Sequence, residues 1–350
     1  KWLDNNFYVG TFSLNYDSNQ TNAVFGGSYS SYNGDHFGNL IWAQYASNAA
    51  PNHRFYESNA DKKDFNLYSK VTQRLGTAWT VYADVQYRTV AYNSRGTVKG
   101  PEPIAIDDTL SFFNPKAGIT YRASEASRLY LSYAKAQREP NRSDYENGTP
   151  KSESLNDFEA GWRFKEEKVQ LQANLYYMDY ENQLVLTGAL DAVGEPIRTN
   201  SGASYRFGLE IEAAIQFAEQ WVWQPNLAVS SNKNKDFYFK RDGLLQNLGT
   251  TNISYSPSIV GASNLVYAPS TVFRIALLSK YVGEQYMGNI DADLSKLEAY
   301  LTNDINISYV WTPNSWIKEA QFSLLVNNIF NELYTSNGFF YTFDDDYSVA

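Results

Sequence analysis

The sequence predicts an all-β fold in which long antiparallel strands form a transmembrane β-barrel. Apolar and polar residues alternate with a period of two, most clearly over 169–178 and 208–217, and successive side chains of a strand point to opposite faces. These runs reach about ten residues, the length that a tilted strand needs to cross a membrane, whereas strands of soluble sandwiches have about five or six. The connections between the runs alternate between short and long, as they do in membrane barrels.

The composition supports strands and excludes several other classes. Among the 350 residues, 28 Tyr, 20 Phe and 8 Trp favour strands over helices. No run of about 18 apolar residues is present, so no transmembrane helix is expected. A mean hydropathy of -0.47 still suits a barrel, because half of each strand faces water. The absence of cysteine excludes disulfides and thiolate metal sites, and the net charge of -9 argues against nucleic acid as a partner.

The strands expected in the first part of the chain are separated by short turns at 17–20 and 76–78. They cover 7–16, 21–32, 65–75, 79–92 and 110–122. The segment 40–45 is expected in a large loop or a strand extension beyond the membrane, and 93–109 as a longer connection. No apolar leader is visible at the start, so we expect the numbering to begin after processing or within a longer polypeptide.

The second part continues the series with nine further strands, which makes about fourteen in total. They cover 128–138, 152–164, 169–178, 208–217, 221–231, 253–267, 272–286, 297–311 and 320–329. Long polar connections are expected at 139–150 and 181–199. Aromatic residues stand beside the short turns, where an interfacial belt would lie; these are Trp79, Trp221, Tyr267 and Trp311. The alternative is that they are ordinary core aromatics near strand ends.

A series of motifs then resembles one known family. They are NPKAGITY at 114–121, LYLSYAK at 129–135, REP at 138–140, KSES at 151–154, FEAGW at 158–162, LYYMDYEN at 175–182, NSGA at 200–203, GLEIE at 208–212 and VNNIFNELY at 326–334. In this order and spacing, over most of residues 110–334, they resemble the late barrel of the TonB-dependent outer-membrane receptors.

The resemblance implies a barrel of about 22 strands that is plugged by an N-terminal domain. Residues 1–350 would be a single partial barrel domain, with the plug, the TonB box, the early strands and the closing strand outside it. The implied function is TonB-energised uptake of a scarce nutrient across the outer membrane of a Gram-negative bacterium. An iron chelate (siderophore or haem) or cobalamin is favoured over a glycan. The implied partners are the TonB complex through the plug, outer-membrane lipid, the nutrient itself and a surface lipoprotein.

Other functions remain open at this point. The same kind of barrel could be a passive outer-membrane channel or an adhesin, or a receptor that imports glycans. A soluble secreted carbohydrate-binding all-β protein would also explain the aromatic content. We find no nucleophile elbow, zinc-binding helix or phosphate loop, so we expect no enzyme and no cofactor.

The candidate ligand-binding residues lie in the expected outer loops. Planar rings stack on macrocycles or sugars, and Arg forks grip carboxylates or phosphates. The residues are Trp42, Tyr45, Tyr92, Arg95, Arg138, Arg142, Tyr145 and Tyr286. His36 and His53 could contact haem or a metal chelate, or be solvated.

Four charged residues on polar strand faces are expected to face the lumen, either along a ligand path or as hydrated wall charges. They are Arg88, Glu210, Glu212 and Asp304. The acidic run 344–346 could bind calcium, although a solvated acidic loop is the favoured interpretation.

Overall fold

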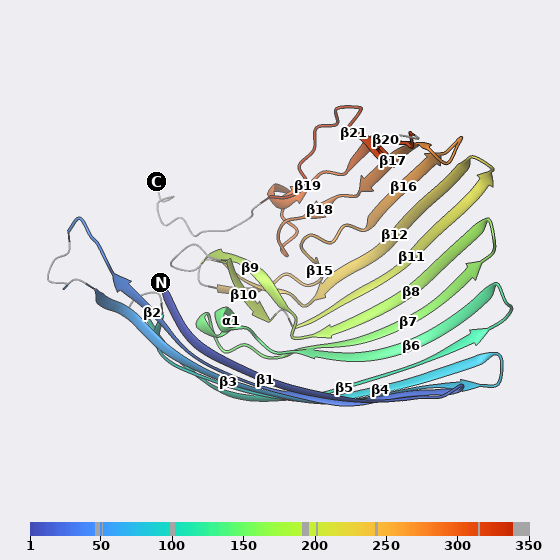
Figure 1. Cartoon of the computed structure of the whole chain (residues 1–350). Helices are drawn as coiled ribbons and strands as arrows, with labels where there is room; N and C mark the ends of the chain where they lie inside the picture. Colours follow the sequence, from blue (N-terminus) through green and yellow to red (C-terminus); the bar gives the residue numbers. More distant parts are fainter. Residues whose placement is uncertain are drawn as a thin grey trace.

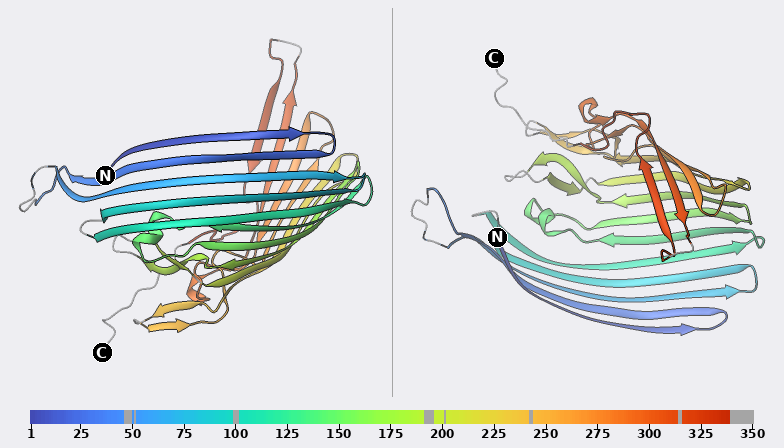
Figure 2. Two further views of the ribbon diagram at one scale, coloured as in Figure 1. Left: turned by 90° about the horizontal axis from the view of Figure 1, so that it is seen from below. Right: turned by 45° about the horizontal axis from the view of Figure 1, so that its top comes forward.

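A computed structural model gives the fold of the chain and describes residues 1–45, 50, 52–98, 102–190, 196–200, 202–241, 244–313 and 316–338. One antiparallel sheet curves through the described part as an open arc, with β1 at one edge and β21 at the other (Figures 1 and 2). The main path holds fourteen strands, and the short β15 pairs with β12 beside it. The expected all-β antiparallel arc is therefore confirmed.

The strands of the arc follow the chain order. They are β1 (Trp2–Asp17), β2 (Thr21–Leu40), β3 (His53–Leu75), β4 (Trp79–Val98), β5 (Glu102–Arg122), β6 (Ser127–Arg138), β7 (Glu153–Lys165), β8 (Val169–Glu181), β11 (Ala203–Ala218), β12 (Trp221–Lys235), β16 (Ile259–Tyr267), β17 (Phe273–Val282), β20 (Tyr300–Trp311) and β21 (Ala320–Val326).

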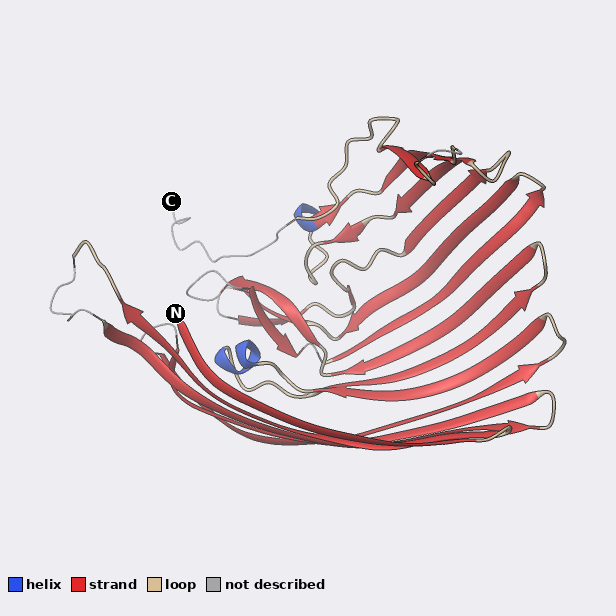
Figure 3. Cartoon of the chain, in the orientation of Figure 1, coloured by secondary structure: helices blue, strands red, loops and turns tan. Residues whose placement is uncertain are grey.

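The smaller elements all lie at one end of the strands, which we call the loop end (Figure 3). They are helix α1 (Arg142–Glu146), the pairs β9 (Leu184–Leu190) with β10 (Pro196–Asn200), β13 (Tyr238–Arg241) with β14 (Leu244–Asn247), and β18 (Gln285–Tyr286) with β19 (Lys296–Leu297), the strand β15 (Thr251–Asn252) and the 3-10 helix η1 (Asp293–Ser295). Short turns occupy the opposite end, so the predicted alternation of short and long connections is confirmed except between β4, which ends at Val98, and β5, which begins at Glu102.

The sheet keeps one apolar and one polar face throughout. On the apolar, outer face Val85, Leu175 and Ile211 are 42%, 44% and 40% exposed, and no second layer covers them in the described structure. An uncovered apolar face of this extent is the surface that a barrel presents to acyl chains. The inner, concave face is polar, and α1 and the β9–β10 hairpin lie on this side (Figure 1).

Aromatic pairs mark the short-turn end of the outer face. The ring of Trp79 lies 4.4 Å from that of Tyr121, and the ring of Trp221 lies 4.6 Å from that of Tyr267. Both pairs join neighbouring strands directly opposite each other. Such rings suit the boundary between headgroups and hydrocarbon, where one side of the ring is apolar and the other is wet.

Several strand ends differ from the sequence-based expectation. β4 and β5 continue through most of 93–109, which was expected as a connection, because their ladder pairs Asn93 to Val98 with 102–107. β3 likewise begins at His53 rather than at 65. Conversely, β16 begins at Ile259 rather than at 253. Pro257 lies just before it and has no N–H to donate to a ladder.

Within the described ranges, no helix is long and apolar enough to cross a membrane.

Candidate functional site at the loop end of the inner face

The connection between β6 and β7 folds onto the inner face instead of projecting away from the sheet. It carries α1, whose first turn is held by a reciprocal capping box. The Asp144 amide donates to Asn141 Oδ1 at 3.0 Å, and the Asn141 amide donates to Asp144 Oδ2 at 2.8 Å. Two of the free N–H groups at the helix start are thereby satisfied. The capping box gives this connection a defined shape.

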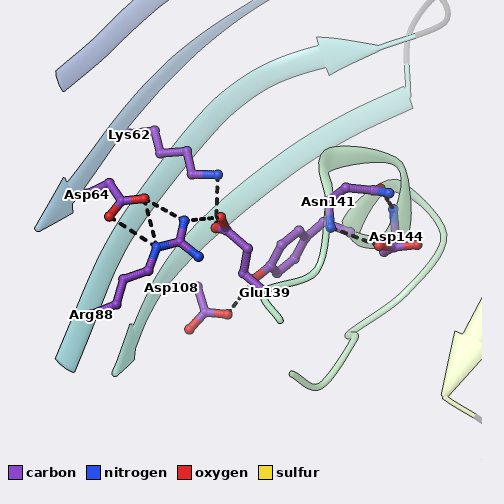
Figure 4. A network of polar contacts seen from close by, with 8 residues as sticks. Lys62, Asp64, Arg88, Asp108, Glu139, Asn141 and Asp144 are labelled. Carbon is purple, nitrogen blue, oxygen red and sulfur yellow. Dashed lines mark hydrogen bonds and ion pairs between the residues drawn. The ribbon is translucent and has the colours of Figure 1, made fainter. Parts of the chain in front are cut away.

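Four charged side chains fasten the start of this connection to the sheet (Figure 4). Glu139 accepts from Arg88 Nη2 at 2.8 Å and from Lys62 Nζ at 2.9 Å. Arg88 Nε also donates to both carboxylate oxygens of Asp64, at 3.1 and 3.0 Å. The side chains of Arg88, Asp64 and Glu139 are 27%, 22% and 17% exposed, so these contacts are shielded from most of the solvent. We call these four residues the charged latch.

Tyr145 of α1 adds a second attachment to β5. Its hydroxyl donates to Asp108 Oδ2 at 2.6 Å, and its ring meets that of Tyr92 edge-on at 5.9 Å. Burial, followed by the hydrogen bond to the Asp108 carboxylate, raises the pKa of the Tyr145 hydroxyl above its usual value. Both rings pack against a buried apolar cluster of Val98, Ile104 and Ile106. The helix thus covers the extended ends of β4 and β5.

Arg142 of α1 reaches β3 and approaches the end of β2. Its Nη2 donates to Ser58 Oγ at 2.9 Å, and its Nε pairs with Glu146 at 2.8 Å. On β2, His36 Nε2 and the Tyr32 hydroxyl share a hydrogen bond of 3.0 Å. Burial, and after it the positive charge of Arg142, lowers the pKa of His36 below 6.5. This imidazole is therefore held in its neutral form near neutral pH.

The far end of the same connection is fixed beside the β9–β10 hairpin. Glu153 accepts from Arg138 Nη2 at 2.9 Å and from the Leu184 amide at 3.0 Å. The Asn200 side chain bonds both the N–H and the C=O of Lys151, at 2.8 and 3.0 Å. The connection is consequently attached at its start, its middle and its end.

The four residues expected to face the lumen all lie on the inner face. Arg88 belongs to the charged latch. Glu210 stands opposite Asn174, which accepts a hydrogen bond from Tyr130 at 2.8 Å. Glu212 lies two residues further along β11 on the same face, and Asp304 accepts from the Asn328 amide at 2.7 Å. Whether a ligand meets these residues stays a prediction.

The candidate ligand-binding residues fall into two groups. His36, Tyr92, Arg138, Arg142 and Tyr145 lie close to the β6–β7 connection, where they contact other parts of the protein as described above. The other five are not gathered by the fold. Trp42 and Tyr45 are 77% and 87% exposed beyond the end of β2, His53 and Arg95 are exposed on β3 and β4, and Tyr286 lies on β18. Their role in binding stays a prediction, and 344–346 lie outside the described residues.

Several residues of this site had no signal in the sequence. Lys62, Asp64, Asp108 and Glu153 occur in polar stretches without a motif, and Glu139 appeared only within the motif at 138–140. Within the latch, the paired residues are 24 to 77 residues apart in the sequence. No group of three or more His, Cys, Asp or Glu side chains that could hold a metal ion occurs in the described part of the chain.

Comparisons with known proteins agree on the architecture. The family model described as "TonB dependent receptor-like, beta-barrel" matches residues 2–329. No curated protein sequence matches the chain significantly.

Three solved structures illustrate the similarity. The ferric-catecholate import receptor Fiu from E. coli K12 shares 16% identity at a TM-score of 0.66, covering 95% of this chain and 51% of its own. The ferric yersiniabactin uptake receptor FyuA from Yersinia pestis shares 16% identity at a TM-score of 0.66, and the match covers 96% of this chain and 51% of FyuA. The copper transporter OprC shares 16% identity at a TM-score of 0.73, and the match covers 95% of this chain and 52% of OprC. The chain thus spans about half the length of these structures, and identities this low show likeness of fold alone.

Proposed function

The chain belongs to the family of TonB-dependent receptor-like β-barrels, and we propose that it forms part of the wall of an outer-membrane receptor for energised nutrient uptake. The proposed location is the outer membrane of a Gram-negative bacterium, and residues 1–350 are proposed to form one partial barrel domain. The proposed partners are the TonB complex through a plug domain, membrane lipid, a surface lipoprotein and the transported nutrient.

The inward-folded β6–β7 connection is the observation that supports a receptor over a passive channel. A connection with its own helix is fastened to the inner face by the charged latch and by Tyr145, and it reduces the space for free passage at the loop end. Side chains from four strands and this connection then form a polar surface near the loop end. A surface assembled in this way suits selective contact with one ligand better than free passage.

We propose a metal chelate, namely an iron-siderophore or haem, as the nutrient, with cobalamin as the next choice. Fiu and FyuA are described as importing ferric-catecholate and ferric yersiniabactin, which supports this choice by analogy of fold. Arg138, Arg142 and Tyr145 contact the protein itself, so we assign the first capture of the ligand to the exposed rings of Trp42 and Tyr45.

Uptake by a deletion strain tests the proposal. Cells that lack the gene are supplied separately with haem, cobalamin or a panel of ferric siderophores under limitation, in backgrounds with and without TonB. We expect growth on one metal chelate to require both the gene and TonB. TonB-independent entry of many small solutes would instead indicate a passive channel. Recovery of the native protein from aqueous buffer without detergent would indicate a soluble secreted protein.

A further inference from the structure

A row of arginines crosses the inner face at the short-turn end, opposite to the site described above. Arg122 of β5 stands directly opposite Arg128 of β6, and Arg128 stands directly opposite Arg163 of β7. Arg74 of β3, Arg122 and Arg128 line a cavity of about 570 Å³, together with Thr80, Trp79 and the turn at 76–78. We call Arg74, Arg122, Arg128 and Arg163 the basic row.

The pairing of like charges within the basic row is unfavourable on its own. Side chains directly opposite each other on antiparallel strands have Cβ atoms about 5 Å apart, and like charges at such positions destabilise a sheet. Arg74, Arg122 and Arg128 form no ion pair with any carboxylate of the described residues. Arg163 lies over the Tyr130 ring at 5.1 Å and borders a second cavity with Glu212. Guanidinium groups are thus concentrated at this position in a chain whose net charge is -9.

We propose that the basic row is a docking surface for an acidic polypeptide segment that enters the concave side from the short-turn end. Guanidinium groups bind carboxylates through paired, charge-assisted hydrogen bonds. The distance across three adjacent strands is roughly 10 Å. Carboxylates two residues apart on an extended segment are separated by roughly 7 Å, so two of them fall within reach of the long arginine side chains.

The position of the basic row favours a polypeptide over a lipid headgroup. The aromatic pair Trp79 and Tyr121 marks the lipid boundary at the same turns, and it lies on the outer face. Arg122 and Arg128 lie on the other, concave face. A phospholipid beside the outer face would have to reach around the end of the strands to meet these guanidinium groups. This inference needs only the two faces of the sheet and is independent of the nutrient carried.

A binding assay with the detergent-solubilised protein tests the inference. The probe is a fluorescein-labelled hexa-aspartate peptide, followed by anisotropy at low salt. We expect the double variant R122Q/R128Q to bind the peptide at least tenfold more weakly, and added salt to weaken wild-type binding because the contacts are exposed. The control K63Q/K151Q removes the same charge from exposed positions away from the short turns and should stay within twofold of wild type. R122K/R128K keeps the charge and should retain part of the binding.

Two further measurements make the result decisive. Without peptide, Arg128→Gln should raise the denaturant midpoint, because it removes two cross-strand like-charge contacts. With peptide, the wild type should gain stability and R122Q/R128Q should not. Equal loss of binding in the control variant, or unchanged binding in R122Q/R128Q, would overturn the proposal. Displacement of the peptide by inorganic phosphate at the same charge concentration, or stronger binding to phosphatidylglycerol vesicles, would also overturn it and assign the row to a simple anion or a lipid.

Discussion

Replacing Glu139 by Gln removes the carboxylate that Lys62 and Arg88 share, and it should loosen the β6–β7 connection. Glu139 makes two charge-assisted contacts, at 2.9 and 2.8 Å, and its side chain is 17% exposed. Exposed ion pairs contribute about 0–1 kcal/mol, and breaking a buried pair costs about 3–5 kcal/mol. The partial shielding of this pair puts the expected cost at about 2 kcal/mol, which raises the open population of the connection roughly 30-fold.

Trypsin cleavage after Arg142 measures this opening in the folded protein. When opening and closing are faster than cleavage, the cleavage rate follows the open population, so the Glu139→Gln protein should be cut roughly 30-fold faster. Tyr145→Phe removes one hydrogen bond and should give an increase of about fivefold. Asp107→Asn is the matched control, since Asp107 adjoins Asp108 on the opposite face. A cleavage rate for Glu139→Gln within twofold of wild type would refute the role of the charged latch.

Three other predictions concern the faces, the packing and the pH response. Val85→Lys puts a charge on the outer face and should destabilise the protein in bilayers by about 2–4 kcal/mol in an unfolding titration. Gly161→Ala should impair folding, because a Cβ there would lie against the Tyr130 ring, and Tyr130→Ala should restore folding yield. His36 has a lowered pKa, so its contribution to stability is complete above 6.5 and is lost as the pH falls through 6.5 toward the folded-state value; His36→Gln should flatten this part of the stability profile.

Each of these three predictions has a control variant. Thr72→Lys adds the same charge on the inner face and should cost much less than Val85→Lys. Gly10→Ala has open space around the added Cβ and should fold normally. His53→Gln is the matched replacement of an exposed histidine outside the contacts of His36. Equal effects in a variant and its control would contradict the corresponding assignment.

The alternation in the sequence was sufficient to predict which side chains share a face. Val85 and Arg88 were assigned to opposite faces from the pattern of 79–88 alone, and the structure agrees. The face on which a side chain lies is a local property, because each residue of a strand is rotated by half a turn relative to the one before it. The same reasoning failed at 93–109, where β4 and β5 continue beyond the apolar band. The pattern of an apolar outer face and a polar inner face is lost there, since Val98, Ile104 and Ile106 are buried on the inner side beneath the β6–β7 connection.

The sequence by itself determined the strand count, the two faces, the short turns and the family resemblance, because these depend on neighbours within a few residues. Only the tertiary structure decided that Glu139 meets Arg88, that Tyr145 meets Asp108 and that Arg128 faces Arg163. These contacts depend on how a connection folds back and on the register between strands. Neither leaves a local pattern, because the partners are separated by tens of residues and are brought together by the curvature and pairing of the whole sheet.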